Sequence, residues 1–376
     1  MKYSTSLFLV VSVLTCSCSN KNNIILLDDD KITEVELEET CSDIIVKPIK
    51  YSNPMKGIGS CLHFGDYDFL LSTDYRNLYC VKDDTVISEL DKGGRGRGEY
   101  LEIRAFAFSP DDSLLYVAGP HGLNIYKGLN FDFLDVISDI PPITTMRLIG
   151  ENKILAACYI QDNDYKEQNG LFLIDTKKGI HSKPIIAMNR VSKMFHSETD
   201  YYQKADSVYF VIGDRVVNKI YLYNKGIINS KISFKYSKKL QIPKRAWAGS
   251  NNSMSKFGIF SDYIRENDFC IGASYPIIND KSDCLMFWNF HGEDDNILNI
   301  IENDQIRRML IKIPGIDGTL SPDFVSDNYY VTLFQNLYKY NNTYYEDNNF
   351  SNLTKEIFRA YENNNDNPVI LKYHIK

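Results

Sequence analysis

Residues 114–119 read LLYVAG, a short apolar run that ends in small residues and is followed at residues 122–126 by a second strand-like run, GLNIY. Five other runs of the first kind occur along the chain: DFLLS at 68–72, KILAACY at 153–159, SVYFVIG at 207–213, DFCIGAS at 268–274 and NYYVTLF at 328–334. Their starts are separated by 46, 39, 54, 61 and 60 residues. Each interval can hold one four-stranded sheet with its loops, so the spacing indicates a repeated β-sheet unit.

Further strands follow most of these runs. A second strand is predicted as NLYCV at 77, GLFLID at 170, NKIYLY at 218 and CLMFWNF at 284, and a third as TVISEL at 85, FDFLDVI at 131, IHSKPIIA at 180 and GIINSKISF at 226. Such a unit exposes an apolar face, which packing against the next unit would bury. The pattern predicts an all-β, six-bladed β-propeller rather than a β-sandwich, because a sandwich needs no sixfold repeat.

Side-chain size predicts where the strands lie within each blade. The first strands carry small residues that suit a crowded axis: Ser72, Ala118, Gly119, Ala156, Ala157, Gly213, Gly272 and Ala273. Aromatic residues are expected to fill the wider space between blades: Tyr126, Phe172, Tyr223 and Trp288. We therefore expect each small-residue run to be the innermost strand of its blade.

One helix is predicted near the carboxyl terminus. In FSNLTKEIFRAYE, at residues 350–362, Ser351 can cap the helix, and Leu353, Ile357 and Tyr361 fall on one face. A final strand, NPVILKYHI, follows at residues 367–375. We expect the ring to close by pairing the carboxy-terminal strands with an early strand near residues 43–49, so that the propeller spans residues 43–376.

The amino terminus, MKYSTSLFLVVSVLTCSCSN, has one lysine, an apolar run and small residues that end in cysteine. The apolar run is too short to span a bilayer and is typical of a secretory signal. Its ending resembles the lipobox of bacterial lipoproteins, which predicts a lipoprotein signal peptide over residues 1–17, lipidation of Cys18, and an anchor and tether over residues 18–42. The alternatives are lipidation of Cys16 and a plain secretion signal with incidental cysteines.

The glycine-rich stretch DKGGRGRGEY at residues 91–100 invites comparison with phosphate-binding loops. It lacks both the Gly-x4-Gly-Lys-Ser/Thr and the Gly-x-Gly-x-x-Gly patterns of such loops. It lies between the outer strand of one blade and the first strands of the next, where Gly94, Gly96 and Gly98 would allow a sharp crossing. We expect Glu99 to bind backbone amides or Arg95 rather than a ligand.

Residues 94–100, GRGRGEY, resemble a Gly-x-Gly-Pro-Gly-Glu-Tyr motif of the six-bladed, TolB-like β-propeller lipoproteins of Bacteroidota, with Arg97 in place of the proline. NPVIL at 367–371 and IIVKPI at 44–49 are also similar to that family. The resemblance implies a lipid-anchored propeller of the outer membrane and supplies no catalytic residues. In lipoproteins of this group, acidic residues just after the lipidated cysteine favour the cell surface. Here the acids begin only at Asp28, which favours a periplasm-facing position.

The formal charge of the chain is −7, which argues against a nucleic-acid partner.

The chain also carries few signals of catalysis. The six histidines lack metal-binding spacing, the acidic clusters do not match a calcium loop, and no nucleophile elbow is present. We expect no catalytic residue, no metal site and no cofactor, with calcium in a loop or in the central channel as the alternative.

Six cysteines follow the signal region, at positions 41, 61, 80, 158, 270 and 284. Four of them, at 61, 80, 158 and 270, lie in apolar strand-like runs, where a free cysteine behaves as a small hydrophobe. A disulfide between Cys270 and Cys284 across a hairpin is the alternative, but the implied turn places Cys270 nearer Phe287. We expect free thiols.

Candidate binding residues come from basic and aromatic segments. The stretch at residues 235–256 contains no acidic residue and places Lys244 and Arg245 close to Trp247, with a solvated loop as the alternative. Further aromatic candidates, for which packing between blades is the alternative, are Tyr201, Tyr202, Tyr263, Tyr329, Tyr330, Tyr344 and Tyr345. The sequence favours a non-enzymatic, lipid-anchored platform of the cell envelope that binds a protein partner or a glycan. The alternatives are a polysaccharide lyase or hydrolase with a site assembled in the funnel, and a purely structural envelope subunit.

Overall fold

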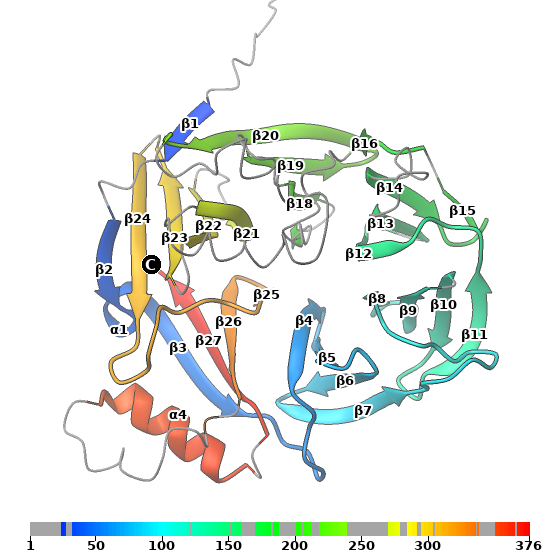
Figure 1. The fold of residues 1–376 in the computed structure, drawn as a ribbon, viewed down its shortest axis with the longest axis horizontal. Helices are drawn as coiled ribbons and strands as arrows, with labels where there is room; N and C mark the ends of the chain where they lie inside the picture. Colours follow the sequence, from blue (N-terminus) through cyan, green and yellow to red (C-terminus); the bar gives the residue numbers. More distant parts are fainter. Residues whose placement is uncertain are drawn as a thin grey trace, which may run out of the picture.

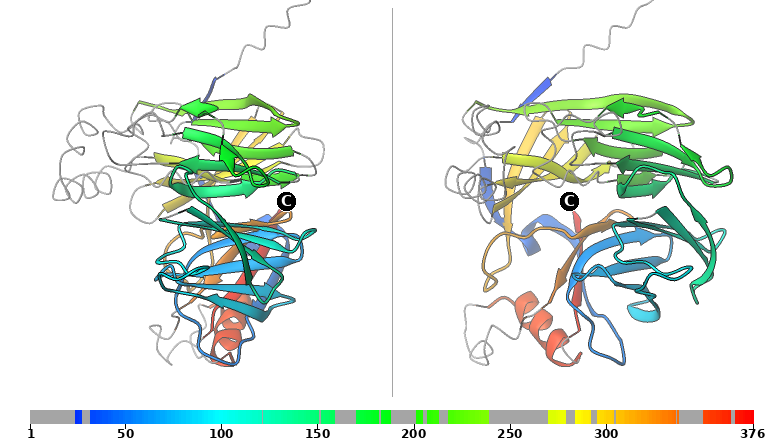
Figure 2. Two further views of the ribbon diagram at one scale, coloured as in Figure 1. Left: turned by 90° about the vertical axis from the view of Figure 1, so that its right-hand side faces the viewer. Right: turned by 45° about the vertical axis from the view of Figure 1, so that its right-hand side comes forward.

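The structure is a computed structural model in which six sheets surround a central axis, one sheet to a blade (Figure 1). Figure 2 shows the same sheets in two further views. The repeat in the sequence is confirmed, because the protein is a nearly all-β, six-bladed β-propeller with one short helix near its carboxyl terminus. The structure describes residues 24–27, 32–120, 122–150, 152–158, 170–181, 183–187, 201–204, 207–212, 218–238, 270–278, 284–291, 295–303, 305–335, 337, 350–364 and 367–376.

The first three blades follow one another along the chain. Blade 1 consists of β4 (Ile58–Phe64), β5 (Tyr67–Ser72), β6 (Asn77–Lys82) and β7 (Thr85–Asp91). Blade 2 consists of β8 (Ala105–Ser109), β9 (Leu114–Gly119), β10 (Gly122–Lys127) and β11 (Asp132–Ile137). Blade 3 consists of β12 (Ile143–Leu148), β13 (Lys153–Cys158), β14 (Gly170–Asp175), β15 (Ile180–His181) and β16 (Ile186–Ala187).

The last three blades each gain a strand from the amino-terminal segment. Blade 4 consists of β17 (Tyr201–Lys204), β18 (Ser207–Ile212), β19 (Asn218–Asn224), β20 (Ile227–Tyr236) and β1 (Ile24–Leu27). Blade 5 consists of β21 (Cys270–Ile278), β22 (Cys284–His291), β23 (Asp295–Glu302), β24 (Gln305–Lys312) and β2 (Ile32–Glu36). Blade 6 consists of β25 (Phe324–Ser326), β26 (Tyr329–Phe334), β27 (Val369–Ile375) and β3 (Cys41–Pro48).

The position of the small-residue runs is corrected by the structure. In five blades these runs form the second strand from the axis, as β5, β9, β13, β18 and β26, and only β21 is a first strand. Ser72, Ala118 and Ala156 are at most 1% exposed. Small residues are required here because neighbouring sheets pack closely against the second strands. The true innermost strands are less conspicuous in the sequence, and β25 has only three residues.

The amino-terminal segment crosses the outer edges of three successive blades. β1 pairs in parallel with β20, β2 pairs in parallel with β24, and β3 pairs antiparallel with β27. A four-residue helix, α1 (Leu37–Thr40), connects β2 to β3. The expected pairing of the early strand with the carboxy-terminal strands is confirmed by the β3–β27 ladder. Residues 24–27 and 32–36, which the sequence assigns to the tether, form strands of blades 4 and 5.

The two ends of the propeller are joined by a buried asparagine as well as by the ladder. Asn367 is 0% exposed and directly precedes β27. Its Nδ2 donates a hydrogen bond to the carbonyl of Tyr51 at 3.2 Å, and its Oδ1 accepts one from the backbone N–H of Met55 at 2.8 Å. This residue therefore fixes the chain as it leaves β3 for blade 1.

The predicted carboxy-terminal helix is confirmed as α4 (Asn352–Glu362). The Ser351 hydroxyl caps it by accepting a hydrogen bond from Thr354 N–H at 3.1 Å. Leu353, Ile357 and Tyr361 are buried on one face, and the helix contacts β3 and β27 outside blade 6 (Figure 1).

The described cysteines behave as core residues. Cys41, Cys61, Cys80 and Cys158 are buried free thiols, and Cys284 is a half-buried one. Burial raises the pKa of both Cys80 and Cys158 to about 12, so neither thiol is ionised at neutral pH. The hairpin register places Cys270 opposite His291 and not near Phe287.

Aromatic residues also pack as expected. Tyr126, Phe172 and Trp288 are at most 2% exposed, and Trp288 packs edge-on against Tyr330 of blade 6 with ring centroids 5.7 Å apart. Packing between blades is therefore confirmed for Trp288, and Tyr126 and Phe172 are confirmed as buried core residues.

Candidate functional site

Two pockets lie along the central channel, between the innermost strands of blades 1, 2, 3 and 6. One, of about 180 Å³, lies at the starts of these strands, where the chain has just crossed from the previous blade. The other, of about 450 Å³, lies at their ends, beside the first hairpin of each blade. We call them the crossing-side pocket and the hairpin-side pocket. His63, Arg147 and Val325 line both, so these three residues separate the two pockets.

The crossing-side pocket combines an aromatic ring with charged and hydroxyl groups. Tyr75, Arg104 and Asp323 line it together with smaller polar residues, which are Ser60, Thr144 and Thr145. Tyr75 is 51% exposed. Arg104 is held by Glu102, with Nε 2.6 Å from the carboxylate. A concave site with one exposed aromatic ring and a few fixed polar groups is typical of a ligand-binding pocket.

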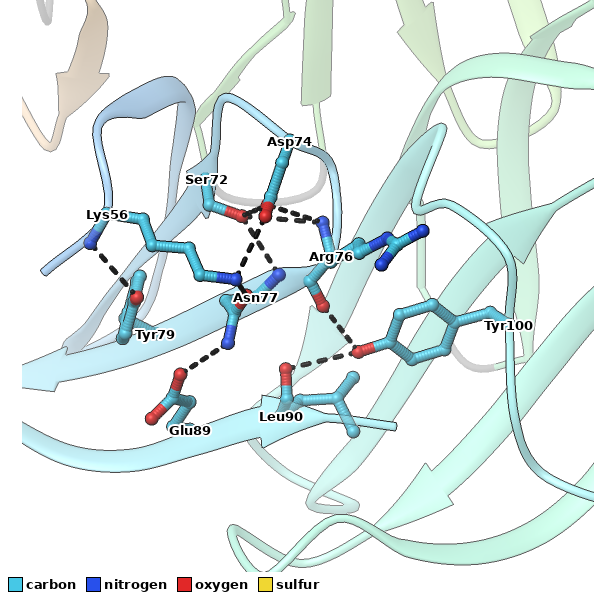
Figure 3. Close-up of polar contacts among 9 residues, drawn as sticks. All are labelled: Lys56, Ser72, Asp74, Arg76, Asn77, Tyr79, Glu89, Leu90 and Tyr100. Atoms are coloured by element: carbon cyan, nitrogen blue, oxygen red, sulfur yellow. Dashed lines mark hydrogen bonds and ion pairs between the residues drawn. The ribbon is translucent and has the colours of Figure 1, made fainter. Parts of the chain in front are cut away.

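Tyr75 is presented to this pocket by a strained turn between β5 and β6. Its φ of +57° lies in the left-handed region, which is uncommon for a bulky residue. The Ser72 hydroxyl donates to Asp74 at 2.5 Å and accepts from Asn77 N–H at 2.9 Å, while Asp74 also accepts from Arg76 N–H at 3.2 Å (Figure 3). These bonds on both sides of Tyr75 hold its backbone in the strained conformation.

Further polar contacts connect the turn to the rest of blade 1. Lys56 Nζ lies 2.9 Å from the Asp74 carboxylate and 2.6 Å from Asn77 Oδ1 (Figure 3). The hydrogen bond from Ser72 and the contact with Lys56 lower the pKa of Asp74 to about 2. Asp74 is therefore ionised at neutral pH and keeps both contacts. Asn77 Nδ2 in turn donates to Glu89 of β7 at 2.6 Å.

The loop at residues 91–100 joins this network and carries blade 1 to blade 2. The Tyr100 hydroxyl donates to the carbonyl of Arg76 at 2.7 Å, which links the loop to the Tyr75 turn (Figure 3). Glu99, for which the sequence predicts backbone amides or Arg95 as partners, accepts a hydrogen bond from Gly96 N–H at 2.6 Å. A Cβ on Gly94 would lie 2.0 Å from Glu99 Oε2. Gly94 and Gly96 thus leave room for the Glu99 side chain inside the loop.

His63 is held at the boundary between the two pockets. Its Nδ1 lies 2.7 Å from Asp68 and 3.1 Å from the Ser326 hydroxyl. A Ser–His–Asp catalytic relay needs the serine and the carboxylate on different ring nitrogens, so this arrangement is not such a relay. The other nitrogen, Nε2, lies 3.6 Å from the exposed carboxylate of Asp327 beside the hairpin-side pocket.

Asp68, which contacts His63, and Asp323, which lines the crossing-side pocket, differ in electrostatic environment. Burial opposes ionisation of Asp68, but the contacts with His63 and Lys372 outweigh it and leave the pKa of Asp68 below its ordinary value. Asp323 is open to channel solvent but surrounded by protein, and this partial loss of water raises its pKa to about 6, against one hydrogen bond from Leu333 N–H. Asp68 is therefore a permanent anion at neutral pH, whereas Asp323 can exchange a proton near pH 6.

Several of the predicted site residues lie outside the described residues, namely Cys18, Lys244, Arg245 and Trp247. The channel residues were not predicted as a site. One signal was present: the hairpin HFGDYD turns at Gly65 and Asp66, which places His63 opposite Asp68. Tyr75 and Asp323 had no comparable signal, because the fold brings them together from separate blades.

The described part of the chain shows neither a metal site nor a membrane-spanning helix. Among these residues, no three or more His, Cys, Asp or Glu side chains are grouped to hold a metal ion. The helices described, α1 and α4, are too short or too polar to cross a bilayer.

No protein family and no curated protein matches the sequence. Solved structures do show similarity in fold. A Bacteroides fragilis protein named as a candidate exported protein superposes with a TM-score of 0.68 at 13% identity, covering 94% of this chain and 99% of that one. A member of the DUF4221 family from Bacteroides vulgatus superposes with a TM-score of 0.53 at 11% identity, covering 92% and 98%. At these identities the likeness establishes the fold alone.

Proposed function

We propose that this protein is a non-enzymatic binding protein of the bacterial cell envelope, anchored by lipid at Cys18, and that it binds a glycan through the crossing-side pocket. The lipobox-like ending of the amino-terminal signal supports the anchor. The name of the Bacteroides fragilis neighbour, which describes it as a candidate exported protein, supports an envelope location. A periplasm-facing outer-membrane position follows from the lack of acids directly after Cys18.

The observation that carries the binding role is the strained presentation of Tyr75 at the pocket. Natural proteins keep a bulky residue in the left-handed region only where surrounding contacts enforce it, and such strain is concentrated at functional sites. The pocket is small and concave, with a carboxylate, two guanidinium groups and hydroxyls around the exposed ring of Tyr75. This chemistry suits a sugar unit better than a protein surface, because a stable protein interface needs roughly 800 Å² from each partner.

A glycan-binding screen with the intact chain tests this function. We expect binding to at least one polysaccharide and its loss in Tyr75→Ala. Ile87→Ala is the matched control, because Ile87 is 44% exposed but lies on the outer strand β7. The glycan proposal fails if no glycan binds or if the Tyr75 and Ile87 variants behave alike. Recovery of a protein from native envelopes that depends on Tyr75 would assign the pocket to a protein partner instead.

The anchor is tested separately by cell fractionation. Membranes are washed with high salt, which removes proteins held by charge alone. Cys18→Ala is then expected in the soluble fraction, whereas Cys16→Ala is expected to stay attached. Attachment of Cys18→Ala that survives the high-salt wash contradicts the anchor and leaves the glycan screen unaffected.

A second candidate function, a polysaccharide lyase or hydrolase, is supported by one observation. His63, Tyr75 and Asp323 line the same pocket, together with Arg104 and Arg147. The pKa of Asp323, about 6, suits an acid–base group that works near neutral pH, and the arginines would attract an acidic sugar. Release of shorter or unsaturated products from a bound glycan, abolished in Asp323→Asn while binding persists, would establish the enzyme. Binding with no product after prolonged incubation supports the non-enzymatic role.

A further inference from the structure

The outer edge of blade 4 carries the strand nearest the amino terminus. β1 begins at Ile24, six residues after Cys18, and runs parallel to β20. Six residues span at most about 20 Å when fully extended. A lipid anchor at Cys18 would therefore hold this edge within about 20 Å of the bilayer surface. The anchor holds no other blade at so short a distance.

This edge is basic, although the protein as a whole is acidic. Residues 218–238, which form β19, β20 and their flanks, include no acidic residue and five lysines: Lys219, Lys225, Lys231, Lys235 and Lys238. The acidic run at 28–30 follows β1 at the end farther from Cys18 and lies outside the described residues. Each lysine beside an anionic bilayer strengthens binding to it by about fivefold.

The opposite side of the ring has the opposite charge. Figures 1 and 2 place β20 and β7 on opposite sides of the propeller. Residues 83–91, which include β7, contain four acidic residues and no lysine or arginine. One of these acids, Asp84, is paired with Lys47 at 2.8 Å. An anionic surface would therefore attract blade 4 and repel blade 1.

The basic edge also exposes two large apolar side chains. Ile227, at the start of β20, is 62% exposed, and Leu26, on β1, is 51% exposed. The register places Leu26 opposite Lys235. Exposed aliphatic residues beside lysines are typical of segments that rest at a lipid–water interface.

We propose that the outer edge of blade 4, formed by Leu26, Ile227, Lys225, Lys235 and Lys238, docks on an anionic lipid surface. The propeller then stands on its rim with the channel axis along the membrane, so both channel pockets stay open to the aqueous side. This inference rests on the proposed anchor at Cys18 for the choice of blade 4, and it does not depend on the glycan proposal.

Vesicle sedimentation with the non-lipidated Cys18→Ala chain tests the surface apart from the anchor. We expect it to bind vesicles that contain phosphatidylglycerol but not pure phosphatidylcholine, and to dissociate as salt rises. Lys225→Glu with Lys235→Glu should weaken binding by about tenfold or more. Lys127→Glu with Lys153→Glu, which gives the same net charge on blades 2 and 3, should leave binding unchanged. Equal weakening by both pairs, or no binding to anionic vesicles, overturns the proposal.

Orientation is measured on the lipidated protein in vesicles. A polarity-sensitive dye on Ile227→Cys should be quenched by brominated lipid, whereas the same dye on Leu134→Cys should not. Leu134 is a matched control, because it is 52% exposed on the outer strand of blade 2. Equal quenching at both sites contradicts rim docking. If the protein is not lipidated at all, the anchor fails, and the sedimentation result still decides whether the surface binds lipid.

Discussion

Lys372 of β27 and Asp68 of β5 form an ion pair at 3.2 Å across the seam between the last blade and the first. The Lys372 side chain is 21% exposed and the Asp68 side chain 10%, so the pair is largely removed from water. Asp68 also contacts His63, whose neighbour Ser326 belongs to blade 6. The seam is therefore held by charge and hydrogen bonds as well as by the β3–β27 ladder.

Breaking the ion pair between Lys372 and Asp68 should destabilise the folded protein. Lys372→Met leaves a buried carboxylate with only His63 to compensate it, and we expect the free energy of unfolding to fall by about 3 kcal/mol. Lys82→Met is the control, because Lys82 pairs with Asp66 at an exposed site and such pairs contribute little. Chemical denaturation of both variants measures the difference. Adding Asp68→Asn to Lys372→Met should recover part of the loss, and a strictly additive double variant would argue against direct coupling.

The pH dependence of stability should reveal the raised pKa of Asp323. Between about pH 4, where an ordinary aspartate ionises, and about pH 6, the folded chain holds a proton that the unfolded chain has released. The contribution of Asp323 is therefore most favourable at low pH and is lost as pH rises through this window. Asp323→Asn cannot ionise, so its stability relative to the original chain should increase as pH rises.

Denaturation at several pH values on either side of that window measures this effect. Ser60→Ala, in the same pocket but without a titrating group, is the control and should differ from the original chain by a constant amount. A flat difference for Asp323→Asn would show that the carboxylate is as well hydrated in the folded protein as in the unfolded chain.

The sixfold repeat was predictable because second strands such as β9 and β13 are buried on both faces and so have continuous apolar, small-residue sequences. The same cause produced the error about the innermost strands, which face the channel and carry mixed side chains such as His63 and Arg147. The channel site was not predictable for a further reason. His63, Ser326 and Lys372 are separated by up to 309 residues in the chain, and only closure of the ring brings them together.

Alanine substitutions in the loop at 91–100 should differ in their effect on stability, because Gly98 is sterically required and Gly93 is not. A Cβ on Gly98 would lie 2.4 Å from Cγ of Phe133, and its φ of +74° disfavours any other residue. Gly98→Ala should therefore lower the free energy of unfolding by at least about 1 kcal/mol. At Gly93 no atom lies within 4 Å of the added Cβ, so Gly93→Ala is the control and should have little effect. Equal thermal stability of the two variants would contradict the role of Gly98 at the blade crossing.

The turn that presents Tyr75 should show a conflict between stability and binding. Glycine adopts the left-handed conformation without the steric cost that tyrosine incurs, so Tyr75→Gly should raise the free energy of unfolding by about 1 kcal/mol. The same change removes the exposed ring and should abolish glycan binding. Ile87→Gly, at a comparably exposed position in the strand β7, should instead lower stability and leave binding intact. If Tyr75→Gly is destabilising, the tyrosine ring itself holds the turn, and its strained backbone gives no reason to assign it a binding role.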